Sequence, residues 1–354
     1  MLISDDFECR EYGQLLEEFA GLCEGLVEKG CPYLAVILCH ELYRFLYPAE
    51  PYANFNNTDP VEFIVGHIKR LIESGQSFSE SLAPYDMNLN LLSRCDERQT
   101  LERSTSELYS DLWQGFDTSD LTDESFRLLT DRLPKDIIEE NIVGKNVLDM
   151  GCGSGRHSIA LAKVGAGRVT GIDLQRKSFA AAKQWCKDNN LSVQFEEGNV
   201  HRLRFDNGAF DFVFCNGVLH HTSSIEKGLQ ELSRVLKKSG KAFLYLYASG
   251  GAFWTTRRVL RRIFKKIPIA YTKSVLRMIG MPSKRFVFCD TWYVPQEIHT
   301  TEKQLIEMLD KIGFSYRKVI GNNSFDLDAA IEKNVAGAEK MWGDGEHRYI
   351  LGLR

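Results

Sequence analysis

From Lys145 onwards the chain alternates short apolar segments with helical ones, and this alternation constrains the fold more than any other feature. Runs rich in β-branched and aromatic residues indicate buried strands, at 146–149, 168–173, 192–196, 210–215 and 241–247. The stretches between them predict helices, at 158–164, 178–189 and 225–236. Strands that alternate with helices form a parallel sheet covered on both faces, so we predict an α/β, Rossmann-like doubly wound sheet.

Two further strands are expected near the end of the chain. They lie at 315–320 and 348–353, after a helix at 302–312 whose N-cap is Thr301. These two strands can pair antiparallel at one edge of the sheet. The prediction is therefore a mostly parallel, seven-stranded sheet with an antiparallel edge strand.

The N-terminal part has a different texture. Residues 11–82 show apolar side chains at helical spacing, interrupted by a breaker cluster at 48–59. We expect a helical N-terminal accessory region over residues 1–100 and a catalytic domain over residues 101–354. Within that domain, about fifty residues between the fifth strand and Glu302 exceed what a minimal sheet needs, and they predict an insertion at about 250–298.

Charge is distributed unevenly along the chain. The formal net charge is −4, but residues 1–142 hold 28 acidic and 11 basic side chains, a net of −17. The remainder holds 20 acidic and 33 basic side chains, a net of +13. Between Glu231 and Asp290 there are 14 basic residues and no acidic one. The acidic half argues against a surface built wholly for nucleic acid, which we regard as a disfavoured partner.

The cysteines and the N-terminus indicate a compartment. Nine cysteines are scattered without a C-x-x-C pair, so neither a zinc site nor a redox motif is expected, and no metal is predicted. Scattered thiols suit a reducing cytosol. The first residues are acidic, unlike a signal peptide, and the longest apolar run is far too short to span a membrane. We expect a cytoplasmic protein.

A glycine-rich turn follows the first strand of the sheet. It reads DMGCGSG at 149–155, directly before a helix, where glycines allow backbone N–H groups to approach a ligand closely. Asp173 ends the second strand, 18 residues after Gly155, where a carboxylate can accept bonds from two ribose hydroxyls. A nicotinamide-dependent oxidoreductase shares both features, so the turn alone does not separate the two classes of enzyme.

Longer motifs do separate them. The chain reads VLDMGCGSG at 147–155, GID at 171–173, FDFVFCNGVLHH at 210–221 and LSRVLKKSGK at 232–241. In this order the motifs resemble those of the class I S-adenosylmethionine-dependent methyltransferases, including the quinone-biosynthesis type. The dehydrogenase motif G-x-G-x-x-G is not met, because Arg156 and His157 follow Gly155.

The resemblance implies a set of residues that bind the cofactor S-adenosyl-L-methionine and its product S-adenosyl-L-homocysteine. Asp149 would orient the glycine loop and the amino group of the ligand, and Asp173 would take the ribose hydroxyls. Leu174 would pack on the adenine. The loop itself would line the methionine and ribose parts, through Gly151, Cys152, Gly153 and Gly155.

Three further positions follow from the same resemblance. Asn199 stands where the family usually has an aspartate that accepts from the adenine amino group, and an amide oxygen can still accept that bond. The backbone N–H of Val200 would serve an adenine ring nitrogen. Asn216 would face the methionine end and the substrate, with a strand-end cap as the alternative. Tyr109 would cover the cofactor, or else it docks the preceding segment.

Methyl transfer is an in-line displacement, so proximity and orientation supply much of its rate. A general base is required only when the nucleophile arrives protonated. His220 and His221 follow the fourth strand and are candidates, against the alternative that they only orient their loop. His299 is a further candidate. Cys152 is not interpreted as a nucleophile.

The insertion carries the candidate substrate residues. Trp254, Arg257 and Arg261 belong to a segment with an apolar side and a broad cationic side. Three readings stay open for it: a lid with a solvated basic face, a receptor for an anionic substrate, or peripheral contact with an anionic membrane. Trp292 and Tyr293 line the substrate pocket or are ordinary packing.

These observations lead to one expected function and its rivals. We expect a cytoplasmic S-adenosylmethionine-dependent methyltransferase that acts at oxygen, nitrogen or carbon of a small molecule, which can be anionic. The segment NGVL at 216–219 lacks the motif of enzymes that methylate amines of flipped nucleobases. The alternatives are an RNA or protein methyltransferase that uses the basic insertion, and a catalytically silent regulatory protein that binds the cofactor.

Overall fold

The structure, a computed structural model, describes residues 10–46, 60–81, 104, 105, 108, 118–174, 179–281, 289–320 and 337–354. The chain divides into two compact units. The first comprises Met1–Arg98, Ser249–Tyr293 and Leu327–Gly345, and the second comprises Gln99–Ala248, Val294–Asp326 and Glu346–Arg354. The boundary at residue 100 and the insertion at about 250–298 stay predictions, but residues 249–293 group with the N-terminal helices rather than with the sheet.

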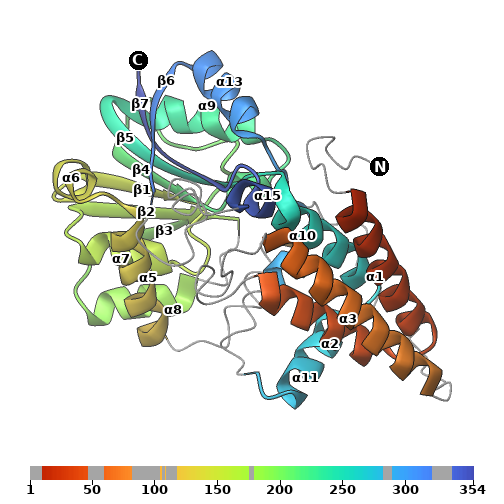
Figure 1. Ribbon diagram of the computed structural model, residues 1–354. Helices are drawn as coiled ribbons and strands as arrows, with labels where there is room; N and C mark the ends of the chain where they lie inside the picture. Colours follow the sequence, from red (N-terminus) through yellow and green to blue (C-terminus); the bar gives the residue numbers. More distant parts are fainter. Residues whose placement is uncertain are drawn as a thin grey trace. The chain divides into compact units, whose positions relative to one another are not determined.

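The second unit is built on a seven-stranded sheet with the order β3-β2-β1-β4-β5-β7-β6 (Figure 1). Its strands are β1 (Asn146–Met150), β2 (Arg168–Asp173), β3 (Val193–Glu197), β4 (Phe210–Asn216), β5 (Leu236–Tyr247), β6 (Phe314–Lys318) and β7 (Glu346–Leu353). The first five are mutually parallel, and β7 is antiparallel to both β5 and β6. The predicted α/β fold with a mostly parallel sheet is confirmed, and its antiparallel strand is β7, inserted between β5 and β6.

Helices cover both faces of this sheet because alternate residues of each strand point to opposite faces. Leu148, Val213 and Leu244 face a core completed by α9 (Ile225–Val235) and α13 (Glu302–Ile312). Val147, Phe214 and Phe243 face a core completed by α5 (Thr118–Arg132) and α7 (Arg156–Lys163). Figure 1 shows these two layers, with α8 (Phe179–Asp188) beside α5 and α7.

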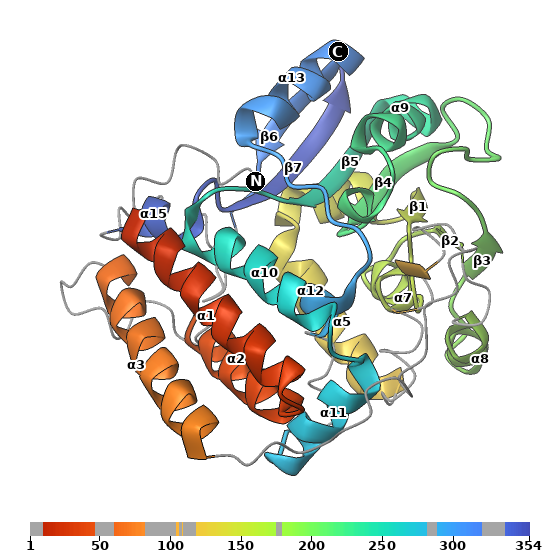
Figure 2. The same cartoon turned by 90° about the vertical axis from the view of Figure 1, so that its right-hand side faces the viewer.

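The first unit contains helices and no strand among its described residues. Figure 2 shows α1 flanked by α2, α3 and α10, and α1 contacts all three. The helices are α1 (Arg10–Glu28), α2 (Pro32–Leu46), α3 (Pro60–Ser81), α10 (Gly251–Phe264), α11 (Ile269–Met278), α12 (Asp290–Tyr293) and α15 (Ala338–Trp342). Phe19, Ile64 and Phe264 are almost fully buried in this unit. No helix within the described ranges is long and apolar enough to cross a membrane.

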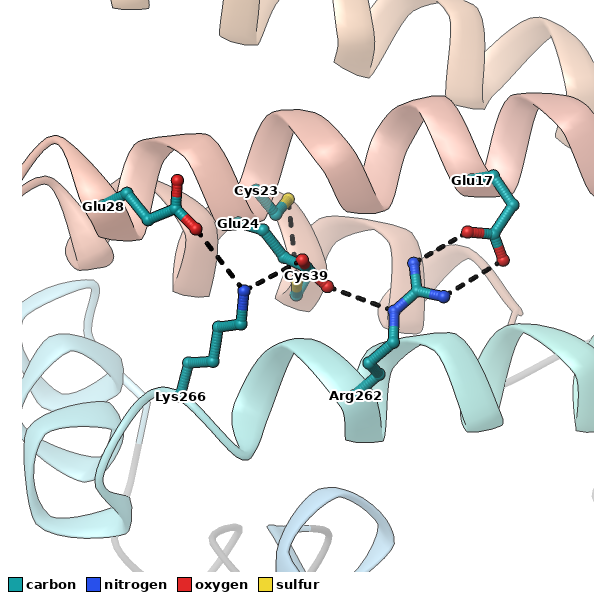
Figure 3. A network of polar contacts seen from close by, with 7 residues as sticks. All are labelled: Glu17, Cys23, Glu24, Glu28, Cys39, Arg262 and Lys266. Atoms are coloured by element: carbon teal, nitrogen blue, oxygen red, sulfur yellow. Dashed lines mark hydrogen bonds and ion pairs between the residues drawn. The ribbon is translucent and has the colours of Figure 1, made fainter. Parts of the chain in front are cut away.

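Opposite charges join α1 to α10 within the first unit. Arg262 lies 2.9 Å from Glu17 and 3.1 Å from Glu24, and Lys266 lies 2.9 Å from Glu24 and 3.6 Å from Glu28 (Figure 3). The Lys266 ammonium lowers the pKa of the Glu24 carboxyl, with help from Arg262. Part of the positive charge of the basic insertion is therefore neutralised by acidic side chains of α1. The acidic and basic segments, which lie far apart in the sequence, form ion pairs with each other.

Candidate active site

The glycine loop 151–155 joins β1 to α7 and is held by backbone bonds. Gly151 N and Cys152 N both donate to Ile172 O on β2, at 2.9 and 2.8 Å. A Cβ at Gly151 would lie 2.5 Å from the side chain of Val218, and one at Gly155 would lie 2.5 Å from Phe195. Both glycines have φ above +80°, a region that side chains other than glycine rarely adopt. These two positions require glycine for the loop to pack at all.

Gly153 differs from its neighbours because it faces open space. A Cβ built there meets no heavy atom within 4 Å, and its φ is +54°. Its N–H donates to Oδ2 of Asp173 at 2.9 Å. The carboxylate that should receive ribose hydroxyls therefore lies beside the part of the loop that is open to a ligand. This arrangement fits a nucleoside, because a ligand can reach the backbone and the carboxylate together.

Asp149 ends β1 in a buried position, 2% exposed. Its Oδ2 accepts a hydrogen bond from the Ser158 hydroxyl at 2.6 Å. Burial raises the pKa of Asp149 to about 7; the hydrogen bond from Ser158 opposes this shift and the nearby charge of Asp173 adds to it. A positively charged ligand group close to this carboxyl would favour its ionised form. The predicted contact with a ligand amino group is chemically consistent with this position.

The predicted adenine-binding residues follow β2 and β3. Leu174 is half-buried directly after β2, and Val200 is buried at 8% exposure. The side-chain oxygen of Asn199 accepts the backbone N–H of His201 at 2.8 Å, so one of its two lone pairs already has a donor. The adenine contacts of these residues stay predictions. Tyr109 lies outside the described residues.

The three candidate histidines lie around one tyrosine, Tyr247 at the end of β5. His220 stacks on the Tyr247 ring with centroids 3.7 Å apart, and His221 meets it edge-on at 5.4 Å. His299 lies on the same ring at 6.1 Å. The structure therefore brings together side chains that 79 positions of sequence separate, from His220 to His299.

Hydrogen bonds assign a tautomer to two of these histidines. The backbone N–H of Tyr247 donates to Nδ1 of His220 at 3.1 Å, so that nitrogen holds the lone pair and Nε2 holds the proton. His221 places Nδ1 2.9 Å from the carbonyl oxygen of Gln296, so Nδ1 holds the proton and Nε2 the lone pair. Of these two rings, a neutral His221 is the one whose lone pair lies on Nε2.

His299 is held differently. Its Nδ1 lies 2.8 Å from the carbonyl oxygen of Ala248, and its Nε2 lies 3.2 Å from the carboxylate of Glu297. Both ring nitrogens therefore face oxygen acceptors. An imidazole bonded in this way is suited to hold a loop in place rather than to take a proton from a substrate. A catalytic role for any of the three histidines stays a prediction.

A polar row crosses the sheet at the carboxyl ends of β4 and β5. Asn216 on β4 pairs with Tyr245 on β5, which pairs with Arg348 on β7, so their side chains share one face. One row earlier the same face is apolar, with Phe214, Phe243 and Ile350. The face changes from core to polar at the edge where open α/β sheets bind ligands.

Further charged groups complete this polar row. Tyr245 donates its hydroxyl proton to Oε1 of Glu346 at 2.6 Å, and Arg348 forms an ion pair with the same carboxylate. Burial would raise the pKa of Glu346, but Arg348 and Arg132 outweigh it and hold this pKa below its ordinary value. Arg132, at the end of α5, donates to Oδ1 of Asn216 at 2.7 Å and lies 5.0 Å over the Tyr245 ring.

His157 forms the other end of this network. The amide nitrogen of Asn216 lies 3.3 Å from Nε2 of His157, so Nε2 is the acceptor and Nδ1 carries the proton. Burial, together with Arg156 and Arg132, lowers the pKa of His157 well below its ordinary value, and the ring stays neutral. Asn216 is therefore more than a strand-end cap, because it connects Arg132 to the helix that follows the glycine loop.

Sequence reasoning missed most of this network, specifically Arg132, His157, Tyr245, Glu346 and Arg348. They come from four different elements, α5, α7, β5 and β7, which meet through the sheet order and through the packing of the two helices on the sheet. One signal was present in the sequence. Charged residues occupy alternate positions 346 and 348 directly before the apolar end of the last strand, which is the pattern of a strand whose face turns from polar to apolar.

The predicted substrate residues belong to the first unit. Trp254 and Arg257 are buried, and the Arg257 guanidinium lies 5.7 Å over the Trp254 ring. Trp292 stacks on Phe264 with centroids 4.1 Å apart. Tyr293 donates its hydroxyl proton to Ile267 O at 2.9 Å. These are packing contacts within that unit, and a substrate role for these residues and for the half-buried Arg261 stays a prediction.

Neither the thiols nor clusters of ligating side chains suggest other chemistry in the described parts of the chain. Cys152 is buried, and burial raises the pKa of its thiol well above the ordinary value, with Asp149 and Asp173 adding to the shift. An ionised thiolate is the nucleophilic form, so this environment suits a structural cysteine. Among the described residues, no group of three or more ligating side chains could hold a metal ion.

Comparison with known proteins shows what the part of the chain that holds this site is similar to. Residues 147–240 match the family described as a methyltransferase domain. The ubiquinone biosynthesis O-methyltransferase of Coxiella burnetii is 33% identical over 126 residues, which cover 32% of this chain and 53% of that protein. The ribosomal protein L11 methyltransferase of Dictyoglomus thermophilum is 40% identical over 97 residues, which cover 27% and 31%.

The family match therefore lies within the second unit, which contains the sheet. The chain spans about half the length of the ubiquinone biosynthesis relatives that it matches, 53% for Coxiella burnetii and 45% for Haemophilus ducreyi. A solved S-adenosylmethionine-dependent methyltransferase from Mesorhizobium loti resembles 65% of this chain and 96% of its own, with 16% identity and a TM-score of 0.41. The motifs, the sheet order and the family match agree that residues 147–240 are similar to a methyltransferase domain.

Proposed function

We propose that this chain is a methyltransferase that uses S-adenosyl-L-methionine to methylate a hydroxyl oxygen of a small molecule. The observation that carries the proposal is the glycine loop, open at Gly153 and hydrogen-bonded there to Asp173. S-adenosyl-L-methionine supplies a methyl group on a sulfonium leaving group, so the protein has to bind, orient and exclude water. Asp173 would bind the ribose, and Asp149 would orient the amino group.

Proton removal distinguishes a hydroxyl acceptor from a carbon acceptor that is already nucleophilic. In a neutral His221 ring the lone pair lies on Nε2, because the Nδ1 proton faces the carbonyl of Gln296. It contacts Tyr247 at the carboxyl end of β5 and belongs to the turn 219–221 that follows β4 and Asn216. A neutral imidazole there can take the proton that a hydroxyl loses as it is methylated. The two relatives named as O-methyltransferases support oxygen as the methylated atom.

A second candidate is protein methylation, which the similarity to a ribosomal protein methyltransferase favours. The two candidate functions differ in the molecule that receives the methyl group, a small molecule or a protein. Purified chain is incubated with methyl-labelled S-adenosyl-L-methionine and a cell extract that has been separated into small molecules, RNA and protein. The proposal expects label in the small-molecule fraction, as a methyl ether. Label in protein or RNA alone, or label on carbon, contradicts it.

The cofactor contact separates transfer by this chain from transfer by contaminants in the extract. An Asp173→Ala chain should lose the labelled product in proportion to its loss of cofactor binding. Asp188→Ala is a matched control, because Asp188 is an exposed carboxylate at the end of α8 in the same unit. Product formation that is equal in Asp173→Ala and wild-type preparations would assign the activity to another protein.

A further inference from the structure

Two guanidinium groups and one carboxylate gather on the Tyr245 ring at the carboxyl edge of the sheet. The guanidinium carbons of Arg132 and Arg348 lie 5.0 and 6.0 Å from the ring centroid. Glu346 is the carboxylate, bonded to Arg348 and to the Tyr245 hydroxyl. These three charged groups carry one net positive charge, since His157 beside them is neutral. Bringing two like charges together in a buried place costs free energy unless a further anion joins them.

The position of Arg348 in the sheet indicates whether the anion belongs to the nucleoside cofactor or to the methyl acceptor. Neighbouring strands lie about 4.8 Å apart, so β7 lies about 14 Å from β1, across β4 and β5. The glycine loop and Asp173 follow β1 and β2, which places the nucleoside on that side. Arg348 stands on the far side of Asn216, where the second reactant has to approach the methyl group.

We infer that Arg348 and Arg132 receive an anionic group, a carboxylate or a phosphate, on the methyl acceptor. The inference rests on the proposed function and adds the chemical class of its substrate. Planar guanidinium groups match the oxygens of carboxylate and phosphate with paired hydrogen bonds. The rings of Tyr245 and Tyr247, whose centroids lie 6.0 Å apart, form an aromatic surface beside the charged groups. Arg132 is well suited to the role, because its hydrogen bond to Asn216 goes to a neutral amide and not to a carboxylate.

Glu346 acts as a competitor for the same guanidinium groups. Its carboxylate holds Arg348 and Tyr245 in place when no anion is bound. An anion that binds here has to displace the Glu346 carboxylate from the guanidinium groups. Its measured affinity is therefore set by the difference between its own interaction with these groups and that of Glu346. Removing the negative charge of Glu346 should strengthen anion binding, whereas removing a guanidinium should weaken it. An ion pair that serves only to stabilise the fold gives no such change of opposite sign.

The test measures binding of two simple anions, benzoate and inorganic phosphate, to the full chain by calorimetry, with and without saturating S-adenosyl-L-homocysteine. At least one anion should bind the saturated wild-type chain. Arg348→Gln and Arg132→Gln should each weaken that binding about tenfold, the factor that about 1.4 kcal/mol represents. Glu346→Gln should tighten it by a similar factor. Arg317→Gln is the matched control, an exposed arginine on β6 paired with Asp136, and it should change nothing.

Three results overturn the inference. The first is that neither anion binds the wild-type chain. The second is that all four variants bind the anions as the wild type does. The third is that the anions bind only in the absence of S-adenosyl-L-homocysteine, and that Arg348→Gln weakens the binding of S-adenosyl-L-homocysteine itself. The last result would assign the guanidiniums to the carboxylate of the cofactor. Should Arg348→Gln fail to fold, Arg132→Gln and Glu346→Gln still decide the sign. Failure of S-adenosyl-L-homocysteine to bind refutes the proposed function instead, and it is measured separately.

Discussion

The Tyr245 hydroxyl lies 2.6 Å from Oε1 of Glu346, although the two residues are 101 positions apart. Their meeting depends on the antiparallel pairing of β5 with β7, which sets Tyr245 opposite Arg348 and Tyr247 opposite Glu346. The same contact stabilises the last strand of the sheet and completes the polar edge of the candidate active site. Stability and substrate binding are therefore expected to respond together when this contact is changed.

Tyr245→Phe removes the hydroxyl and leaves the ring. Because a buried hydrogen bond to a charged group contributes about 1.5–3 kcal/mol, the free energy of unfolding should fall by about that amount. Denaturant unfolding followed by circular dichroism measures it. Tyr316→Phe, on the more exposed edge strand β6, is the control and should change stability by less than about 0.5 kcal/mol. Equal effects of the two substitutions would contradict the assigned role of Glu346.

Asp149 predicts a pH dependence of stability. Its pKa rises from 3.8 to about 7 on folding, so between these values the folded chain holds a proton that the unfolded chain has lost. The contribution of Asp149 to the free energy of unfolding is therefore fully present below the unfolded-state pKa of 3.8. It falls as the pH rises and is lost above the folded-state pKa of about 7. In Asp149→Asn this loss is absent. From about pH 5 to about pH 8 the wild type should lose about 2–3 kcal/mol relative to that variant.

Unfolding of both chains in denaturant at several pH values measures this difference. Ser158 can still donate its hydroxyl proton to the amide oxygen at position 149, so the variant keeps that hydrogen bond. Parallel pH profiles for the two chains would show that Asp149 is ionised in the folded chain throughout, contrary to the pKa expected from its burial.

Sequence patterns predicted those parts of the molecule in which neighbours in sequence remain neighbours in space. The helix at 302–312 begins after Thr301 as expected, and Thr301 and Gln304 form a reciprocal cap there. The glycine loop and Asp173 were also expected to lie together, and they do, because a single β-α-β crossover connects them; their binding role stays a prediction. The strand expected at 241–247 instead begins at Leu236, since charged and polar residues at 237–239 conceal its first half.

The polar edge was not predictable in the same way. Arg132, Asn216, Tyr245 and Arg348 meet only because β4, β5 and β7 are adjacent, and adjacency of distant strands leaves no local pattern. The pairing of Glu17 and Glu24 with Arg262 was hidden for the same reason. Charge counts showed an acidic and a basic part, but not that the two parts neutralise each other within one unit.

His221 should be a base and His220 a structural residue. His221→Gln removes the proton-accepting nitrogen, and turnover should fall by about 100-fold or more with little change in cofactor affinity. Raising the pH should restore part of this loss, because a hydroxyl acceptor then ionises without help. His220→Gln should instead lower stability, since the Tyr247 N–H loses its acceptor. Unchanged turnover in the His221 variant would remove it from the mechanism.

The charges between α1 and α10 predict a small, salt-dependent contribution to stability. Glu24 is partly exposed and bridges Arg262 and Lys266 (Figure 3). Glu24→Gln should lower the free energy of unfolding by about 0.5–1 kcal/mol at low ionic strength and by less in high salt. Glu18→Gln, an exposed position on the same helix, is the control. A loss for Glu24→Gln that salt does not reduce would argue against an electrostatic role.

Cofactor binding tests the central claim most directly, because the open glycine loop and Asp173 carry it. Calorimetry with S-adenosyl-L-homocysteine should give saturable binding to the wild-type chain. Asp173→Ala should weaken it by about 1–3 kcal/mol, the scale of losing charge-assisted hydrogen bonds. Gly153→Val should weaken it further, since a side chain would fill the open space above the loop and a β-branched residue would strain the backbone at a φ of +54°. No detectable binding to the folded wild-type chain at millimolar ligand, or equal binding by all three chains, would contradict the account.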